Sequence, residues 1–457
     1  MNKSGSDKVI SSTAACRWTI VAAAVWLSLC ANGAAVDEPF KMPANKSPQK
    51  IRGEINVWAW TIAAGSLQKL LPLFNEKYPN IKVNISKTGW QVQQRLLLSL
   101  SAGVGAPDIT QLLGMETQRY TFTGELMDLT GVAGQYEKDF VPSTWQNCLY
   151  NGKLCAIPWD FGPCAVFYKR HIFKLYGIDP NKIETWDDYI AAGKVIFEKS
   201  NGKTKMFHLP TGMLFEVYLI LIQQNGGQLF DDQGRIAVNS EKSLQVMTLL
   251  KRMLESGVTV NDPLYTHAHY ASLRSDSVAT YPMAAWWGGT IKDYAPETKG
   301  DWGIFRLPAL EPGGLRASSS GGSVLVIPDQ CKNKEAVWAF VDFALCNTRA
   351  QIEQYKNFDL FPTWLPAYKD PFFDEPDPFY GGQKVRLLFA QDIEKIPPLN
   401  RTKDWPEGQA YLAQSLTGWA SRGMGEPEKM LDELEKKLCR RLSREIAPTS
   451  LKFTRKN

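Results

Sequence analysis

The sequence predicts an α/β fold with more than one lobe. The chain has 457 residues, more than a single hydrophobic core usually organises. Hydrophobic residues make up 44% of it and charged residues 22%, a balance typical of soluble globular proteins. Strand-like and helix-like segments alternate in the first third, and a strand, a helix and a second strand in succession build a parallel sheet.

The chain opens with a segment typical of a secretory signal. Lys3, Lys8 and Arg17 precede an apolar run at 18–31, and small residues follow through Ala35. This run is shorter than the ~20 residues of a membrane-spanning helix. The sequence therefore predicts export, with cleavage after the small residues.

We expect residues 1–35 to be the signal peptide, residues 36–50 to be a polar leader and the mature protein to reach the periplasm. Lipid attachment at Cys30 is the alternative. Leu29, which precedes this cysteine, is larger than the usual small residue of a lipoprotein signal.

Hydrophobic spacing predicts the helices and strands in order. Residues 55–60 are rich in strand formers, and the helix that follows buries the face of Leu67, Leu70 and Phe74, with Ser66 as its N-cap. Further strands are expected at 81–85, 107–111, 278–285 and 323–327, and further helices at 91–103, 117–124, 186–198, 214–224 and 240–256. Prolines between 362 and 378 predict an extended crossover segment.

The six cysteines beyond the signal offer one plausible pair. Asn151-Gly152 is a strong two-residue turn signal, and counting outward from it places Cys148 opposite Cys155. A disulfide between them is geometrically possible in an exported protein.

Charge and metal-ligand content exclude two classes of function. The net charge of +5 concentrates near the carboxyl terminus, on a segment with an apolar helical stripe and no aromatic platform for bases, so we expect no nucleic-acid partner. The chain has four histidines and no Cys-x-x-Cys motif, so we expect no metal and no cofactor. His267 and His269 are expected at the surface.

A series of short motifs then resembles a known family, the family 1 extracellular solute-binding proteins, carbohydrate-binding relatives of maltose-binding protein. The motifs, in chain order, are Asn56-Val-Trp58, Phe74-Asn-Glu-Lys-Tyr-Pro79, Gly105-Ala-Pro-Asp-Ile109, Gly124-Glu-Leu-Met-Asp-Leu129, Tyr150-Asn-Gly-Lys-Leu154, Ile157-Pro-Trp159, Phe167-Tyr-Lys169, Glu184-Thr-Trp186, Asn225-Gly-Gly227, Trp302-Gly-Ile304, Gly321-Gly322 and Asn333-Lys-Glu-Ala-Val-Trp-Ala-Phe340. Each motif is weak evidence alone, but together, in this order, they are distributed along most of residues 52–440.

The resemblance implies a type II periplasmic-binding-protein fold, with a ligand cleft between two lobes that close by hinge motion. It implies chain crossings at 159–164, 313–322 and 361–371. The lobes are then discontinuous: residues 51–160 with 315–365, and residues 161–314 with 366–457. It further implies a monomeric receptor that delivers a carbohydrate to the permease and ATPase of an ABC importer, without catalysing a reaction.

Aromatic residues at strand ends predict a sugar site. A pyranose has flat C–H faces that stack on aromatic rings, and a rim of hydroxyls that carboxylates and amides bind. The candidate ligand-binding residues are Trp60, Trp90, Gln91, Gln111, Trp159, Asp160, Glu216, Trp286, Trp287, Gly288, Gly321 and Trp364. For each tryptophan a place in the core is the competing interpretation, and Gly321 and Gly322 serve either a close ligand approach or a turn.

Three alternatives remain open. A secreted glycoside hydrolase would need two carboxylates about 5–10 Å apart, and nothing in the sequence locates such a pair. A receptor for glycerol phosphate or another charged solute would need arginines or several carboxylates in the cleft. A purely sensory receptor would share the fold and the ligand.

Overall fold

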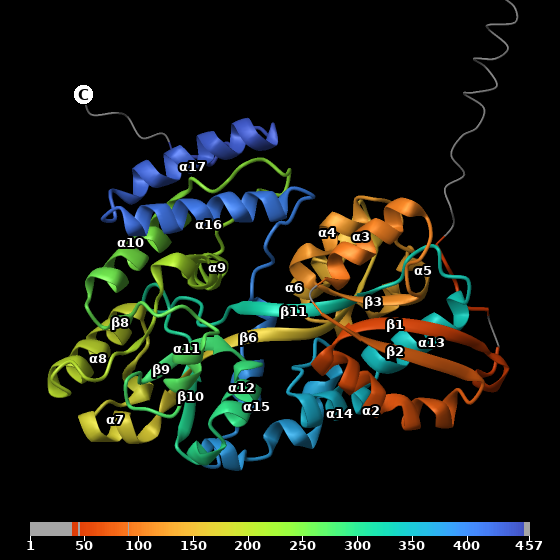
Figure 1. The fold of residues 1–457 in the computed structure, drawn as a ribbon, viewed down its shortest axis with the longest axis horizontal. Helices are drawn as coiled ribbons and strands as arrows, with labels where there is room; N and C mark the ends of the chain where they lie inside the picture. The colour runs from red at the N-terminus through yellow and green to blue at the C-terminus, as the bar shows by residue number, and fades with distance from the viewer. Residues whose placement is uncertain (1–38, 44–45, 90, 452–457) are drawn as a thin grey trace, which may run out of the picture. The chain divides into compact units, whose positions relative to one another are not determined.

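The described chain is built around one mixed sheet that is flanked by helices (Figure 1). The structure is a computed structural model that describes residues 39–43, 46–89 and 91–451, and the residues from Phe40 onward form one compact unit. The predicted signal peptide, Cys30 and Trp90 lie outside the described residues. None of the described helices is long and apolar enough to span a membrane.

The strands are β1 (Gly53–Trp60), β2 (Ile81–Thr88), β3 (Ile109–Leu113), β4 (Leu149–Tyr150), β5 (Lys153–Leu154), β6 (Ile157–Lys169), β7 (Phe207–His208), β8 (Thr259–Val260), β9 (Thr280–Ala284), β10 (Trp302–Arg306) and β11 (Ser319–Val326). The α-helices are α2 (Thr61–Lys77), α3 (Val92–Ala102), α4 (Thr117–Thr121), α5 (Thr130–Ala133), α6 (Pro142–Gln146), α7 (Arg170–Tyr176), α8 (Trp186–Lys199), α9 (Leu214–Gln224), α10 (Glu241–Glu255), α11 (His267–Ala271), α12 (Trp287–Tyr294), α13 (Lys334–Leu345), α14 (Thr348–Phe358), α15 (Val385–Ala390), α16 (Trp405–Ser421) and α17 (Pro427–Leu442).

The expected strands and helices are present, and most of their ends are shifted. The largest shift is in α2, which begins at Thr61 directly after β1. Ser66 is therefore not the N-cap but a buried residue inside the helix, where its hydroxyl donates to the carbonyl of Ala63 at 2.8 Å. The proline-rich stretch is not extended either, because it forms three short 3-10 turns at Leu365–Lys369, Pro371–Asp374 and Pro378–Tyr380.

Strand β6 joins the two ends of the sheet. The order of the main path is β10-β6-β11-β3-β1-β2, and β9 also pairs with β6. The first half of β6 runs antiparallel to β11, whereas its second half lies between β9 and β10. Beyond β11 the parallel strands β1, β2 and β3 complete the predicted strand–helix–strand unit.

Two groups of buried side chains cover this sheet. In the second half of β6, Ala165 and Phe167 belong to the first group, and Cys164, Val166 and Tyr168 belong to the second. This alternation follows from the period of two in a strand. The first group also takes in α2, α13 and α14, and the second takes in α8, α9, α10, α16 and α17.

The later passage between the two groups lies further along the chain than the expected crossing at 361–371. Phe361 runs beside β6, where its carbonyl accepts from the backbone N–H of Phe161 at 2.9 Å. Core residues from Phe361 to Ile396 belong to the first group, and the second group resumes at Leu399. The division into two lobes at the boundaries given above stays a prediction.

The pairing of β6 with β11 is interrupted by a bulge that depends on glycine. The register shifts between Ser319 and Gly322, and both Gly321 and Gly322 have positive φ angles, of 82° and 99°. Opposite the bulge, a Cβ on Gly162 would lie 1.8 Å from the carbonyl oxygen of Ser320. Only glycine fits this close approach of two backbones.

We therefore expect Gly162→Ala to destabilise the protein by about 1–3 kcal/mol, because the added methyl group forces the two crossing strands apart. Urea unfolding monitored by circular dichroism measures the change. Gly418→Ala is the control, since nothing lies within 4 Å of a Cβ at this position inside α16, and alanine there should be neutral or stabilising. Equal midpoints for the two variants would contradict the packing argument.

Candidate functional site

A buried polar network ties together the strands that meet at the bulge. Asp160 of β6 accepts hydrogen bonds from the backbone N–H and the hydroxyl of Ser323. The Ser323 hydroxyl oxygen accepts from Nε2 of Gln111 at 3.0 Å, and Oε1 of Gln111 accepts from the backbone N–H of Trp60 at 3.0 Å. Burial raises the pKa of Asp160. The structure thus brings together three predicted ligand residues, Trp60, Gln111 and Asp160. The side chains of Gln111 and Asp160 hold the four strands β1, β3, β6 and β11 together.

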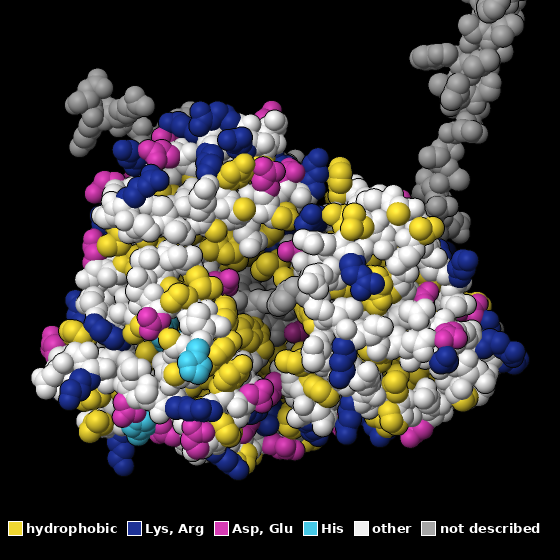
Figure 2. Space-filling model, in the orientation of Figure 1, with side chains coloured by type: hydrophobic (Ala, Val, Ile, Leu, Met, Phe, Trp, Pro, Cys, Tyr) yellow, Lys and Arg dark blue, Asp and Glu magenta, His cyan; other side chains and the backbone are white. Residues whose placement is uncertain are grey.

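Next to this network lies a narrow recess that is lined by side chains of both groups. Glu216 of α9, Tyr265, Met283 of β9 and Ser320 of β11 are among the residues that line it. The indole N–H of Trp286 donates to the carbonyl of Ser320 at 3.1 Å. Figure 2 shows the surface hollowed where β6 and β11 pass between the two groups of helices, with hydrophobic side chains along its wall. These four lining residues, together with the adjacent Trp286, are called the recess residues below.

Aromatic and acidic groups of the recess residues are available to a ligand. The rings of Tyr265 and Trp286 lie 6.3 Å apart at 36°. Tyr265 is 39% exposed, and Trp286 is half-buried and packs against both groups of buried side chains. Glu216 makes no hydrogen bond or ion pair with any described residue, and burial raises its pKa. The recess itself has a volume of only about 20 Å³. A polyhydroxylated ligand would therefore meet the ring faces and the carboxylate at its mouth, where rings stack on sugar faces and a carboxylate accepts from hydroxyls.

Neutral histidines support the recess from beneath. Burial lowers the pKa of both His208 and His269 to about 4. His269 is 1% exposed and stacks on Trp287 with the ring centroids 4.9 Å apart. The expectation that His269 lies at the surface is therefore wrong, and its imidazole is part of the aromatic packing under Tyr265.

Four predicted ligand contacts are corrected by their burial. Trp159 is 1% exposed and its indole N–H donates to Oε1 of Gln354 at 2.7 Å. Trp287 is fully buried, and Trp364 packs against aromatic neighbours while its N–H donates to Thr348. A Cβ on Gly288 would lie 2.4 Å from the hydroxyl of Tyr380, so this glycine makes room for a side chain of the protein.

The other candidates lie at the edges of strands and helices. Trp60 ends β1 and is half-buried, Gln91 is exposed just before α3, and Gly321 lies in the bulge against the indole of Trp286. Sequence reasoning missed Tyr265, Met283 and Ser320. Tyr265 lies in a turn with a positive φ of 61°, and no spacing in the sequence marks such a position.

The cysteine hairpin has the expected register. Leu149 pairs with Leu154, and the backbone N–H of Cys155 donates to the carbonyl of Cys148 at 3.0 Å. Both cysteines are free thiols in this structure, so the disulfide stays a prediction.

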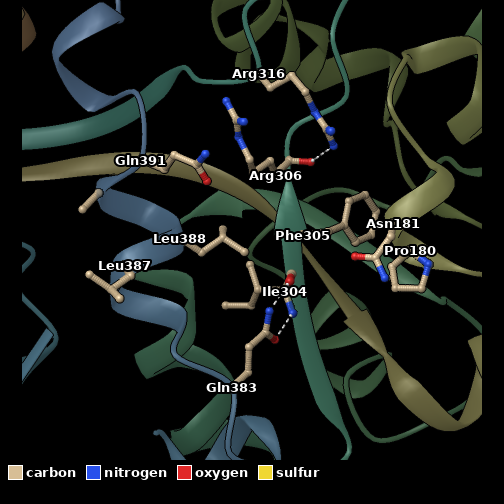
Figure 3. A pocket seen from close by; sticks show the side chains of 11 residues that line it. Pro180, Asn181, Ile304, Phe305, Arg306, Arg316, Gln383, Leu387, Leu388 and Gln391 are labelled. Carbon is tan, nitrogen blue, oxygen red and sulfur yellow. Dashed lines mark hydrogen bonds between the residues drawn. The ribbon is translucent and has the colours of Figure 1, made fainter. Parts of the chain in front are cut away.

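A larger pocket lies elsewhere, between β10 and α15 (Figure 3). It has a volume of about 720 Å³ and none of the predicted ligand residues line it. Its arginines are engaged by the protein: Arg316 donates to the carbonyls of Leu307 and Ile183, and Arg306 pairs with Asp392. These contacts fix the loop between β10 and β11, and they leave the recess residues as the better candidate site.

Comparisons with known proteins assign the family. The family model described as bacterial extracellular solute-binding protein matches residues 59–347. The chain belongs to this family. It is 30% identical over 408 residues to an arabinooligosaccharide-binding protein of Bacillus subtilis, covering 85% of this chain and 93% of that relative. A lactose-binding protein of Rhizobium radiobacter is 23% identical and covers 76% of this chain and 84% of its own length.

Solved structures of solute-binding proteins show the same fold. The sugar-binding protein MalE of Xanthomonas citri superposes with a TM-score of 0.75 at 19% identity, covering 86% of this chain and 98% of that one. The ABC transporter associated binding protein of B. animalis subsp. lactis, solved in complex with β-1,6-galactobiose, superposes with a TM-score of 0.69 at 22% identity. The match covers 85% of this chain and 97% of that one. These matches confirm the predicted α/β fold of type II periplasmic binding proteins.

Because Trp159 is a core residue, we expect Trp159→Ala to cost about 3–5 kcal/mol of unfolding free energy in the absence of ligand. The loss combines a cavity with a broken hydrogen bond to the Gln354 side-chain carbonyl, which keeps only its longer bond from the Ser66 hydroxyl. Chemical unfolding measures it. Trp286→Ala, at the half-buried position, should cost less, and an unchanged midpoint for Trp159→Ala would restore its interpretation as a ligand contact.

Glu216→Gln should stabilise the unliganded protein at pH 7, on the order of 1 kcal/mol or less, since it removes a partly buried charge. A raised folded-state pKa means that the folded protein binds more protons just above the ordinary value of 4.5, so the stability contributed by Glu216 is present below that pH and is lost as pH rises. The gain from the substitution should therefore vanish near pH 4. Glu241→Gln, in the exposed first turn of α10, is the control and should show no such gain.

Proposed function

We propose that this protein is the solute receptor of an ABC importer and that it binds an oligosaccharide at the recess residues. The observation that carries the proposal is the exposed ring of Tyr265 and the half-buried ring of Trp286, placed beside a carboxylate that no described residue engages. Curated relatives named for binding arabinooligosaccharides and lactose support a carbohydrate as the class of ligand.

The ligand is proposed to lie between two lobes. One lobe contributes Glu216, Tyr265, Met283 and Trp286, and the other contributes Ser320 together with Trp60 and Gln91 near the carboxyl ends of β1 and β2. The glycine bulge where β6 meets β11 is proposed as a hinge, because two successive glycines in the left-handed region tolerate the backbone rotations that closure needs. Ligand bound by both lobes then shifts the population toward the closed form.

Charge in the recess favours a neutral sugar over a phosphorylated one. The only acidic side chain among the described residues that line it is Glu216, and no arginine or lysine lines it. A phosphate beside this carboxylate would be repelled without a compensating cation. Sugar hydroxyls, in contrast, donate to a carboxylate.

The rest of the proposed role follows from the family. The protein acts outside the cytoplasm after export, binds its ligand without chemical turnover, works as a monomer and docks on a membrane permease. A binding protein needs complementarity to the ground state of its ligand, since cargo must leave unchanged.

A thermal-shift and calorimetric screen of the purified protein against arabinooligosaccharides, lactose and maltooligosaccharides tests the proposal. A ligand at 100 times its dissociation constant adds about 2.7 kcal/mol to stability. Tyr265→Ala should weaken binding about tenfold or more by removing a stacking face. Tyr294→Ala, at a position of similar exposure on α12, should bind like the unaltered protein. Failure of all the sugars to bind would overturn the proposal.

A further inference from the structure

A second pocket, of about 590 Å³, lies between the two groups of buried side chains and away from the recess. Phe122, Asn147 and Tyr150 line one side of it, and Asp232, Arg401 and Lys403 line the other. Figure 1 shows the elements that frame it, α4 and α6 on one side and the start of α16 on the other. We call it the Arg401 pocket.

The guanidinium of Arg401 is held in place without an anionic partner. It lies over the ring of Trp405 with its central carbon 5.3 Å from the ring centroid. Its Nε atom is buried and unpartnered, and no hydrogen bond or ion pair with a described residue engages the other nitrogens. An arginine stacked on an indole keeps its edge of N–H donors free, and that edge matches a carboxylate.

Neighbouring groups do not neutralise this charge. The nearby thiol of Cys148 is itself buried, which raises its pKa and keeps it protonated. Asp231 is engaged by Arg235 at 2.7 Å, and Arg444 is engaged by Asp404 at 2.7 Å. The charged lining residues without an ion pair are therefore two cations, Arg401 and Lys403, and one anion, the exposed Asp232.

The other unpaired cation of the pocket, the ammonium of Lys403, is directed at an aromatic ring. The ammonium of Lys403 lies 4.5 Å from the ring centroid of Phe122, so it bridges the two sides of the pocket by a cation–π contact. The pocket therefore has one positive charge in excess and a fork of donors that nothing in the described chain satisfies. One excess charge suits a monoanion better than a dianionic phosphate.

We propose that the Arg401 pocket binds the carboxylate of a sugar acid, a uronate, with Arg401 as the anion-binding group. The amide side chains of Asn147, Asn151 and Asn400 also line the pocket, and amides bind the hydroxyls that surround such a carboxylate. Since the two sides of the pocket come from different groups of buried side chains, a bound uronate links them. This site goes beyond the proposed neutral-sugar site and does not depend on it.

Isothermal titration of the purified protein with sodium glucuronate, with glucose and with sodium phosphate tests the site. We expect glucuronate to bind, glucose to show no binding that depends on Arg401, and phosphate to bind more weakly than glucuronate. Arg401→Met keeps the apolar contact with Trp405 and removes the charge, so it should weaken glucuronate binding about 10- to 100-fold. Arg401→Lys, which keeps the charge but loses the fork, should give an intermediate loss.

Arg441→Gln is the matched control, because this arginine is exposed in the last turn of α17 and its loss changes net charge alone. Melting curves without ligand establish that each variant is folded; should Arg401→Met fail to fold, Arg401→Lys carries the test. Equal glucuronate affinity in the Arg401 variants and the control would overturn the proposal, as would Arg401-dependent binding of phosphate without glucuronate. Binding of neutral oligosaccharides in the separate screen stays unchanged in either case, so the two proposals fail independently.

Discussion

The contact on which the rest of the structure depends is the close crossing of β6 and β11. Gly162 lies against the carbonyl of Ser320, and a side chain at this glycine would overlap that oxygen. The crossing brings Ser323 within hydrogen-bonding distance of both Asp160 and Gln111. It also presents the Ser320 carbonyl to the indole of Trp286. Without this approach of two backbones, neither the polar network nor the recess would form.

Much of the fold could be predicted from the sequence because its signals are local. Helix α9 has the predicted bounds, and α10 begins and ends within one residue of the predicted 240–256. The start of α2 could not be predicted, since Trp60 is no favourable cap. Its position is fixed by a side chain distant in sequence, Gln111, which accepts from the backbone N–H of Trp60.

The candidate site was harder to predict because burial is a property of the whole fold. Trp159 lies near the start of β6 and Trp286 follows the end of β9, yet the first is buried and the second is half-buried. What separates them is the partner of each indole N–H, a glutamine side chain inside the core or a carbonyl at the bulge. Glu216 could be predicted as a site residue from its place at the start of a helix. Tyr265 could not be predicted as one, since the turn that holds it has no sequence signature.

The order in which the chain supplies its first group of buried side chains has a consequence for biosynthesis. Phe74 of α2 packs edge to face on Phe340 of α13, and Ser66 hydrogen-bonds Gln354 of α14. More than half of the chain is therefore synthesised after α2 before α13 and α14, the helices on which it packs, exist. Such long-range pairing is slow to form, so this part of the core is completed only late in the synthesis of the chain.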